Sequence, residues 1–281
     1  MQWADHIGAV MFDLLKSAGA AVLIALAPAV SLAQPSASLQ VSVVPAAPPG
    51  PVHVVQGKFL NDNSCSVSHS FTLPSPIQPG DAIIGAFQWE APAACSGGVG
   101  DTVTVGSQQA TILQSIDPNN FGNDHCCAST EYFVLFNVSG TQSAVTISSS
   151  NGSPINNIGV GLVTEISGLS STASVDDFSG NFVYNPPGAG TLTSGPITPS
   201  TAGDFLYGFQ VSTYFGGTLS LGTGWIAGPN SAPNGNPCCY AHSWMDEYIT
   251  NYNSTSPVAA TFGLSSGNGE WWTGIIAIKP Q

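Results

Sequence analysis

Short apolar stretches separated by turn residues run along most of the chain. From His53 onward, segments rich in Val, Ile, Thr, Phe and Tyr alternate with Gly, Pro, Asn and Ser, and none keeps the period of a helix. Many short strands with turn signals between them are typical of two-sheet proteins. We therefore predict an all-β, double-sheet β-sandwich of the jelly-roll type, with strands at residues 81–89, 102–105, 131–138, 144–148, 159–166, 204–213, 243–250, 258–264 and 271–278.

Three sequence landmarks occur twice, in the same order. The distances between the copies are 203 − 80 = 123, 238 − 126 = 112 and 272 − 159 = 113 residues. The landmarks are Gly-Asp-Ala-Ile-Ile-Gly at 80–85 with Gly-Asp-Phe-Leu-Tyr-Gly at 203–208, Cys-Cys at 126–127 and 238–239, and the strands beginning at 159 and 272. The repeat predicts a sandwich built from two weakly related halves, about 53–166 and 200–281, joined by a crossover at 167–199. The alternative is chance similarity between β-rich segments.

Residues 1–33 have the features of a secretory signal peptide. An apolar run at 18–33 follows Lys16 and ends in small residues at the positions that a signal peptidase reads. We predict cleavage at the end of this run, with the true start at Met1 or Met11. The alternative is a transmembrane anchor, although the run is shorter than the ~20 residues needed to span a bilayer.

The segment that follows, residues 34–52, is rich in proline and predicts a linker. Its alternating run at 39–44 predicts one further N-terminal strand. Residues 53–281 then fit a single β-sandwich domain, because all-β sandwiches reach about 200–250 residues.

Composition and charge limit the classes of molecule that the protein could bind. The chain has 3 Lys+Arg against 16 Asp+Glu, a net charge of −13, and 43% hydrophobic residues. So few cations cannot neutralise a nucleic acid or an anionic membrane surface, so nucleic acid is excluded as a partner. No later segment is apolar and long enough for membrane insertion after signal cleavage. We expect an acidic, core-forming protein that is secreted or held at the cell surface.

Six cysteines fit an exported protein, in which an even count predicts disulfides. We expect one disulfide between Cys65 and Cys95. The adjacent pairs Cys126-Cys127 and Cys238-Cys239 either cross-link the two halves or each close on themselves. The alternative is a zinc or copper site, for which His125 and His242 would supply further ligands.

Several motifs along the chain together resemble a class of secreted bacterial β-sandwich modules of largely unassigned function. The motifs are Ser-Phe-Thr-Leu-Pro-Ser-Pro-Ile-Gln-Pro-Gly-Asp at 70–81, Glu-Ile-Ser-Gly-Leu at 165–169, the second Gly-Asp strand and the terminal strand at 271–279. The resemblance covers roughly residues 59–279. It implies a sandwich fold and an exported location, and it implies no agreed activity.

Paired carboxylates are the main candidates for catalysis, because glycan hydrolysis needs an acid and a base or nucleophile across a cleft. Glu165 interrupts an otherwise apolar strand, and Glu90 or Glu270 could be its partner. The alternative for Glu165 is a strand-end carboxylate that reaches solvent or a backbone donor. No Gly-x-Ser-x-Gly motif is present, and the five histidines have no triad spacing. The sequence therefore favours a non-catalytic protein.

An oxygen-rich loop at 117–124 is the one candidate cofactor site. Asp117, Asn119 and Asp124 offer the hard oxygen ligands that calcium prefers. The same residue types also fill ordinary turns. We expect no other cofactor.

Aromatic residues suggest the ligand. Trp271, Trp272, Trp89 and Trp244 could form a stacking platform for sugar rings, although most aromatic residues of a sandwich lie in its core. We expect an exported, non-catalytic binding module whose partner is carbohydrate or another surface protein. One alternative is a structural subunit of a fibre or surface layer, assembled by strand donation from 39–44 as a homo-oligomer. The other is a glycan-active hydrolase.

Overall fold

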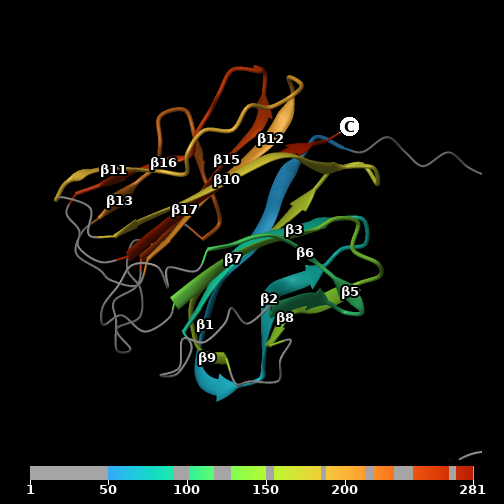
Figure 1. The fold of residues 1–281 in the computed structure, drawn as a ribbon. Helices are drawn as coiled ribbons and strands as arrows, with labels where there is room; N and C mark the ends of the chain where they lie inside the picture. Colours follow the sequence, from blue (N-terminus) through green and yellow to red (C-terminus); the bar gives the residue numbers. More distant parts are fainter. Residues whose placement is uncertain are drawn as a thin grey trace, which may run out of the picture. The chain divides into compact units, whose positions relative to one another are not determined.

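The computed structural model describes residues 50–90, 101–116, 128–149, 155–184, 188–212, 218–230, 243–265 and 270–280. These residues belong to one compact unit, 47–281. They form seventeen strands and the turns between them (Figure 1). No helix in these ranges could cross a membrane.

The strands make four antiparallel sheets, which we name A to D. Sheet A has the order β1 (His53–Ser66), β9 (Ile155–Ser167), β3 (Ala82–Glu90), β7 (Ala128–Leu135), β6 (Thr111–Ile116). Sheet B has the order β2 (Ser68–Ile77), β8 (Gln142–Ser149), β4 (Asp101–Val105), β5 (Gln108–Gln109). Sheet C has the order β10 (Ser174–Tyr184), β17 (Glu270–Lys279), β12 (Asp204–Ser212), β15 (Ser243–Tyr252), β14 (Ile226–Ala227). Sheet D has the order β11 (Gly190–Thr193), β16 (Thr261–Leu264), β13 (Leu219–Ser220).

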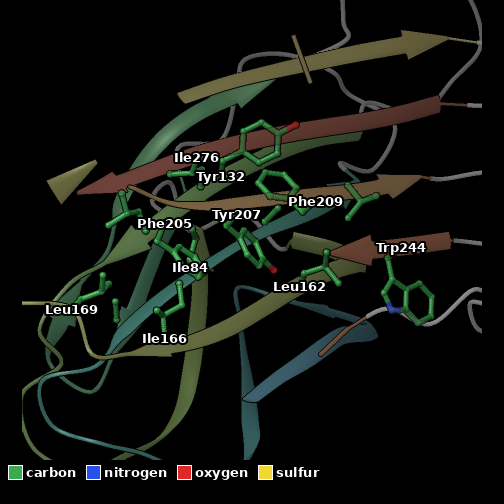
Figure 2. Packing of buried hydrophobic residues seen from close by; sticks show 14 of the residues in the cluster. Ile84, Tyr132, Leu162, Ile166, Leu169, Phe205, Tyr207, Phe209, Trp244 and Ile276 are labelled. Atoms are coloured by element: carbon green, nitrogen blue, oxygen red, sulfur yellow. The ribbon is translucent and has the colours of Figure 1, made fainter. Parts of the chain in front are cut away.

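Three apolar cores hold these sheets in the layer order B–A–C–D (Figure 1). Alternate residues of a strand point to opposite faces, so sheets A and C, each covered on both faces, carry apolar residues at successive positions. In β3, Ile83 packs toward sheet B and Ile84 toward sheet C. In β12, Tyr207 packs toward sheet A and Leu206 toward sheet D. Figure 2 shows the shared A–C core, in which side chains from both halves of the chain meet.

The two halves have the same topology. Taken in strand order across each sheet, β1, β9, β3, β7 and β6 of sheet A correspond to β10, β17, β12, β15 and β14 of sheet C. In the same way β2, β8 and β4 of sheet B correspond to β11, β16 and β13 of sheet D, and the two-residue β5 has no counterpart among the described strands. Even an irregularity recurs: Val55 is a bulge in β1, and Asp176 is a bulge at the corresponding position of β10. The prediction of an all-β sandwich from two related halves is confirmed, and each half contributes its own pair of sheets.

One offset of the predicted repeat is wrong by one residue. Gly85 pairs with Val163 in sheet A, and its counterpart Gly208 pairs with Ile275 in sheet C. Val163 therefore corresponds to Ile275, an offset of 275 − 163 = 112 rather than 113. The structural offset keeps both residues on the face toward the outer sheet of their half, whereas a shift by one residue would reverse the face.

All nine predicted strands are present, with small changes at their ends. The segment predicted as a crossover, 167–199, instead holds β10 and β11, so the second half begins soon after β9 ends. The sequence of β10 lacks the alternating pattern of a strand, because two neighbouring aspartates, Asp176 and Asp177, are followed by the small residues Ser179 and Gly180. As an edge strand with one bulge, β10 does not need the strict alternation on which the prediction relied.

The glycine that ends each Gly-Asp-x-x-x-Gly motif lies where a Cβ has no room, against backbone at Gly85 and against side chains at Gly208. A Cβ on Gly85 would lie 2.3 Å from the carbonyl oxygen of Leu162, on the neighbouring strand. We expect Gly85→Ala to lower the free energy of unfolding by about 1–3 kcal/mol, because the backbone must shift to relieve the overlap. Gly190→Ala is the control: no atom lies within 4 Å of a Cβ there, so it should change stability little. Urea unfolding of both variants tests the difference, and equal stability would contradict it.

Candidate functional site

Glu165 is fully buried and lies on the face of sheet A that covers sheet B. The side-chain amide of Gln56 and the backbone N–H of Gln78 both donate to its carboxylate, the latter at 2.9 Å. Burial raises the pKa of Glu165, against these two hydrogen bonds, and a hydrogen bond with Asp81 raises it further. Gln56 also bonds both backbone groups of Ser75 at 2.8 Å. Glu165 therefore has a structural role: it ties the turn before β3 to sheet A.

The predicted acid–base pairs are wrong on geometry. Glu165 lies opposite Ile83 on β3, and Glu90 is seven residues further along that strand, or about 23 Å at the strand rise of ~3.3 Å per residue. Glycosidase carboxyls lie about 5–9.5 Å apart. Glu270 begins β17 in sheet C, and sheet A lies between that sheet and the Glu165 side chain. Glu165 therefore forms no pair for glycan hydrolysis with either Glu90 or Glu270.

The predicted tryptophan platform is not presented to solvent. Trp244, Trp271 and Trp272 have exposed fractions of 6%, 1% and 0%. Trp272 faces the A–C core and Trp271 the C–D core, because both faces of sheet C are covered. Phe59 of β1 stacks on Trp244 at a centroid distance of 3.5 Å (Trp244 in Figure 2). These three tryptophans are therefore core residues. The fourth, Trp89, has its backbone near the end of β3, and its side chain lies outside the described part of the structure.

A buried polar network joins the two halves around Asp246, which is fully buried. Its Oδ2 accepts hydrogen bonds from the Tyr207 hydroxyl at 2.9 Å, from Thr164 Oγ1 at 3.1 Å and from the Asn230 side chain at 3.0 Å, and its Oδ1 accepts one from the Asn230 backbone at 3.0 Å. Thr164 belongs to sheet A and the others to the second half. Burial raises the pKa of Asp246, against these bonds. The network positions the two halves against each other.

Glu247, the next residue, faces the opposite way, as expected for neighbours on a strand. It is fully buried toward sheet D and accepts the backbone N–H groups of Gly222 at 2.9 Å and Thr261 at 3.2 Å. Burial, with the nearby charge of Asp246, raises the pKa of Glu247 to about 7. Its role is to hold the loop and strand of the outer layer onto sheet C.

The outward face of sheet B is an array of hydroxyls. Inward residues of β2, β8 and β4 fill the B–A core, and the outward residues are partly or fully exposed. The register places them in rows across the strands, Ser68–Ser148–Thr102, Ser70–Thr146–Thr104–Gln109 and Thr72–Ala144. Neighbouring hydroxyls bond one another, Ser68 with Ser148 at 2.9 Å and Thr146 with Ser70 at 3.1 Å. None of these positions carries a charge.

Sheet D, the outer sheet of the second half, presents a smaller face of the same kind. Its inward residues are Leu192, Phe262, Leu264 and Leu219. Its outward residues form the rows Thr191–Gly263–Ser220 and Thr193–Thr261, with Thr218 and Ser265 bonded at 3.0 Å beside them. We call the outward faces of sheets B and D the hydroxyl faces. Sequence reasoning missed them, although alternating Ser/Thr and apolar residues at 68–73 and 101–105 signal them.

Several predicted site residues lie outside the described residues: Cys95, Cys126, Cys127, Cys238 and Cys239, and the calcium candidates Asp117, Asn119 and Asp124. Cys65 has a described backbone opposite Asn156 in β1. The disulfides and the calcium site therefore stay predictions. In the ranges that the structure describes, no group of three or more His, Cys, Asp or Glu side chains could hold a metal.

No protein-family model, curated protein or solved structure matches this chain. The resemblance to secreted bacterial sandwich modules thus stays a prediction.

Proposed function

We propose that the protein is an exported, non-catalytic binding module that adheres to a neutral polysaccharide through its hydroxyl faces. The observation that carries the proposal is the outward face of sheet B, where seven Ser and Thr side chains stand in register without a charge. The buried tryptophans take no part. A sandwich fold alone would not indicate this function.

The chemistry of the face fits a polyol. Each hydroxyl donates and accepts a hydrogen bond, as sugar hydroxyls do. The sheet repeats these groups about every 4.8 Å across strands and about every 6.7 Å along them, so a regular polymer could meet many at once. Each such bond contributes only about 0.5–1.5 kcal/mol, so binding depends on the number of contacts.

Charge decides the ligand class. The chain carries a net charge of −13, and Lys58 and Lys279 are the only lysines in the described ranges, which hold no arginine. Lys58 is bonded to the carbonyl of Thr72 at the edge of the face. An anionic polysaccharide would be repelled, whereas a neutral one pays no such cost.

Binding depletion by insoluble cellulose, chitin and starch granules tests the proposal. We expect the protein to bind at least one of them, and Thr104→Lys with Thr146→Lys to weaken that binding at least tenfold, because two long charged side chains would interrupt the middle row of sheet B. The paired change Thr191→Lys and Ser220→Lys probes sheet D in the same way. The paired change Asn253→Lys and Thr255→Lys, at exposed positions between β15 and β16, is the matched control for two added charges.

Two results would contradict the proposal. One is a folded protein with no affinity for any of the three polysaccharides. The other is binding that survives the changes on both faces together. Assembly by strand donation, the competing hypothesis, depends on residues 39–44, which lie outside the described residues.

A further inference from the structure

Three charged side chains meet at one end of sheet C, on three adjacent strands. Lys279 of β17 lies between Asp176 of β10 and Asp204 of β12 in the strand order. The Lys279 Nζ is 2.8 Å from Asp176 Oδ1, and Asp204 is hydrogen-bonded to the same Asp176 carboxyl. In a chain with 3 Lys+Arg, one of the few cations is thus placed against two carboxyls.

The site is largely shielded from water. The Asp176 side chain is 5% exposed, the Lys279 side chain 28% and Asp204 1%. Lys279 and Asp204 lie two residues from Ala277 and Leu206 on the strand face that packs into the C–D core. Burial opposes the ionisation of Asp176, but hydrogen bonds from Lys279 and Ser200 outweigh burial and lower the pKa of Asp176 to about 2. The two side chains therefore form an ion pair, and Nζ must give up a proton before it can attack.

Further donors fix the Asp176 carboxyl. The backbone N–H of Ser200 donates to Oδ2 and its hydroxyl to Oδ1, the latter at 2.7 Å. These bonds orient the carboxyl and would stabilise negative charge on Oδ2 during attack at Cγ. Burial, followed by the hydrogen bond and charge of Asp176, raises the pKa of Asp204 to about 6. Asp204 can therefore both hold and release a proton near neutral pH.

We propose that Lys279 and Asp176 condense into an intramolecular amide bond, with Asp204 relaying the proton. The ammonium of Lys279 and the carboxylate of Asp176 are the reactants. The bond from Nζ to Cγ forms, one Cγ–O bond breaks, and the oxygen leaves as water with two protons that come from Nζ. Asp204 protonates the leaving oxygen and is reprotonated by the nitrogen. No oxidant, reductant or other co-reactant is needed.

The topology gives this bond a mechanical role. β10 is the first strand of the second half and β17 the last, and they are direct neighbours. A covalent link there closes a loop of 279 − 176 = 103 residues and joins the two strands through which tension on the half would enter. The first half has no such trio, because Val55 and Ser167 occupy the positions of Asp176 and Lys279.

Mass spectrometry of the purified full-length protein, reduced and denatured after incubation of the folded protein to constant mass, tests the proposal. We expect the chain to lack the mass of one water molecule and to yield, on digestion, a branched peptide joining Lys279 to Asp176. Lys279→Arg keeps the ion pair but removes the amine, so it should give the linear mass. Lys58→Arg is the matched control and should keep the branched peptide.

Asp204→Asn separates the relay from the ion pair. We expect this variant to fold, as judged by circular dichroism, and to remain linear. A folded wild-type protein of linear mass would overturn the cross-link. A branched peptide that forms undiminished in Asp204→Asn would overturn the role of Asp204. Neither readout depends on polysaccharide binding.

Discussion

Asp246→Ala should be among the most destabilising single substitutions in the protein. It removes the acceptor that the Thr164 and Tyr207 hydroxyls and two N–H groups of Asn230 share inside the A–C core. The two hydroxyls keep their bond to each other at 2.8 Å and the Asn230 side chain keeps its bond to Thr164 at 3.1 Å, but the Asn230 backbone N–H loses its partner. Each buried polar group left without a partner costs about 1–3 kcal/mol, and the change leaves at least two, the Asn230 backbone N–H and one of the two hydroxyls. We expect a loss of about 4 kcal/mol, a large part of the ~5–15 kcal/mol typical of a domain. Urea unfolding measures it.

Two further variants test whether the loss in the free energy of unfolding comes from the network. Asp246→Asn keeps the shape and one acceptor oxygen, so it should cost less than Asp246→Ala. Thr164→Val removes one donor from the opposite half. Because Thr164 and Asp246 are in direct contact, their effects should be non-additive by about 1 kcal/mol or more in the double variant. Strict additivity would show that the two halves are not coupled through this network.

Stability should be greatest in mild acid and should fall as the pH rises toward 8. Burial raises the pKa of Glu247 to about 7, and burial with the charge of Glu131 raises the pKa of Asp101 to about 8. Burial, with the hydrogen bond and charge of Asp176, raises the pKa of Asp204 to about 6. Between about pH 4 and these values, the folded protein holds protons that the unfolded chain has released, so stability decreases with rising pH.

In the chain without the Lys279–Asp176 amide bond, Asp176 acts in the opposite direction. Burial opposes its ionisation, but hydrogen bonds from Lys279 and Ser200 outweigh this and lower the pKa of Asp176 to about 2. Its contribution is present above the pKa of about 4 of an unfolded aspartate and is lost only in stronger acid. The raised carboxyls therefore decide the trend above pH 4. Between pH 5 and pH 8 the three carboxyls together contribute about six pKa units, or about 8 kcal/mol at ~1.4 kcal/mol per unit. At ~2–4 °C per kcal/mol, we expect the Tm to fall by roughly 15 °C or more.

Asp101→Asn tests the cause of this trend. Asp101 is 7% exposed, and neither of its carboxyl oxygens has a hydrogen-bond partner, so a neutral amide of the same shape should replace the protonated acid at little cost. The variant should match the wild type at pH 5 and be more stable at pH 8, flattening the Tm profile. Calorimetric scans across this range measure both. A Tm that rises with pH, or an Asp101→Asn profile identical to the wild type, would refute the assignment.

The sequence by itself determined the strands whose burial pattern is strong. Inner strands such as β3, β12 and β17 read as near-continuous apolar runs because neighbours cover both their faces, and all were predicted. The two Gly-Asp motifs revealed the duplication because both halves need the same tight turn and the same crowded glycine at Gly85 and Gly208. Opposite facing of Asp246 and Glu247 followed from strand geometry alone.

Only the tertiary structure decided which faces are covered. Trp271 and Trp272 could not both be core in a two-sheet sandwich with one bare face, yet sheet C is buried on both sides and takes in both rings. Sequence periodicity indicates that a face is apolar but not what packs on it. The sequence therefore did not predict the four-layer stack or the separation of Glu165 from Glu90. It also did not predict that Lys279, Asp176 and Asp204 meet. These depend on contacts between residues far apart in the chain, which hydrogen bonding and burial in the folded protein alone select.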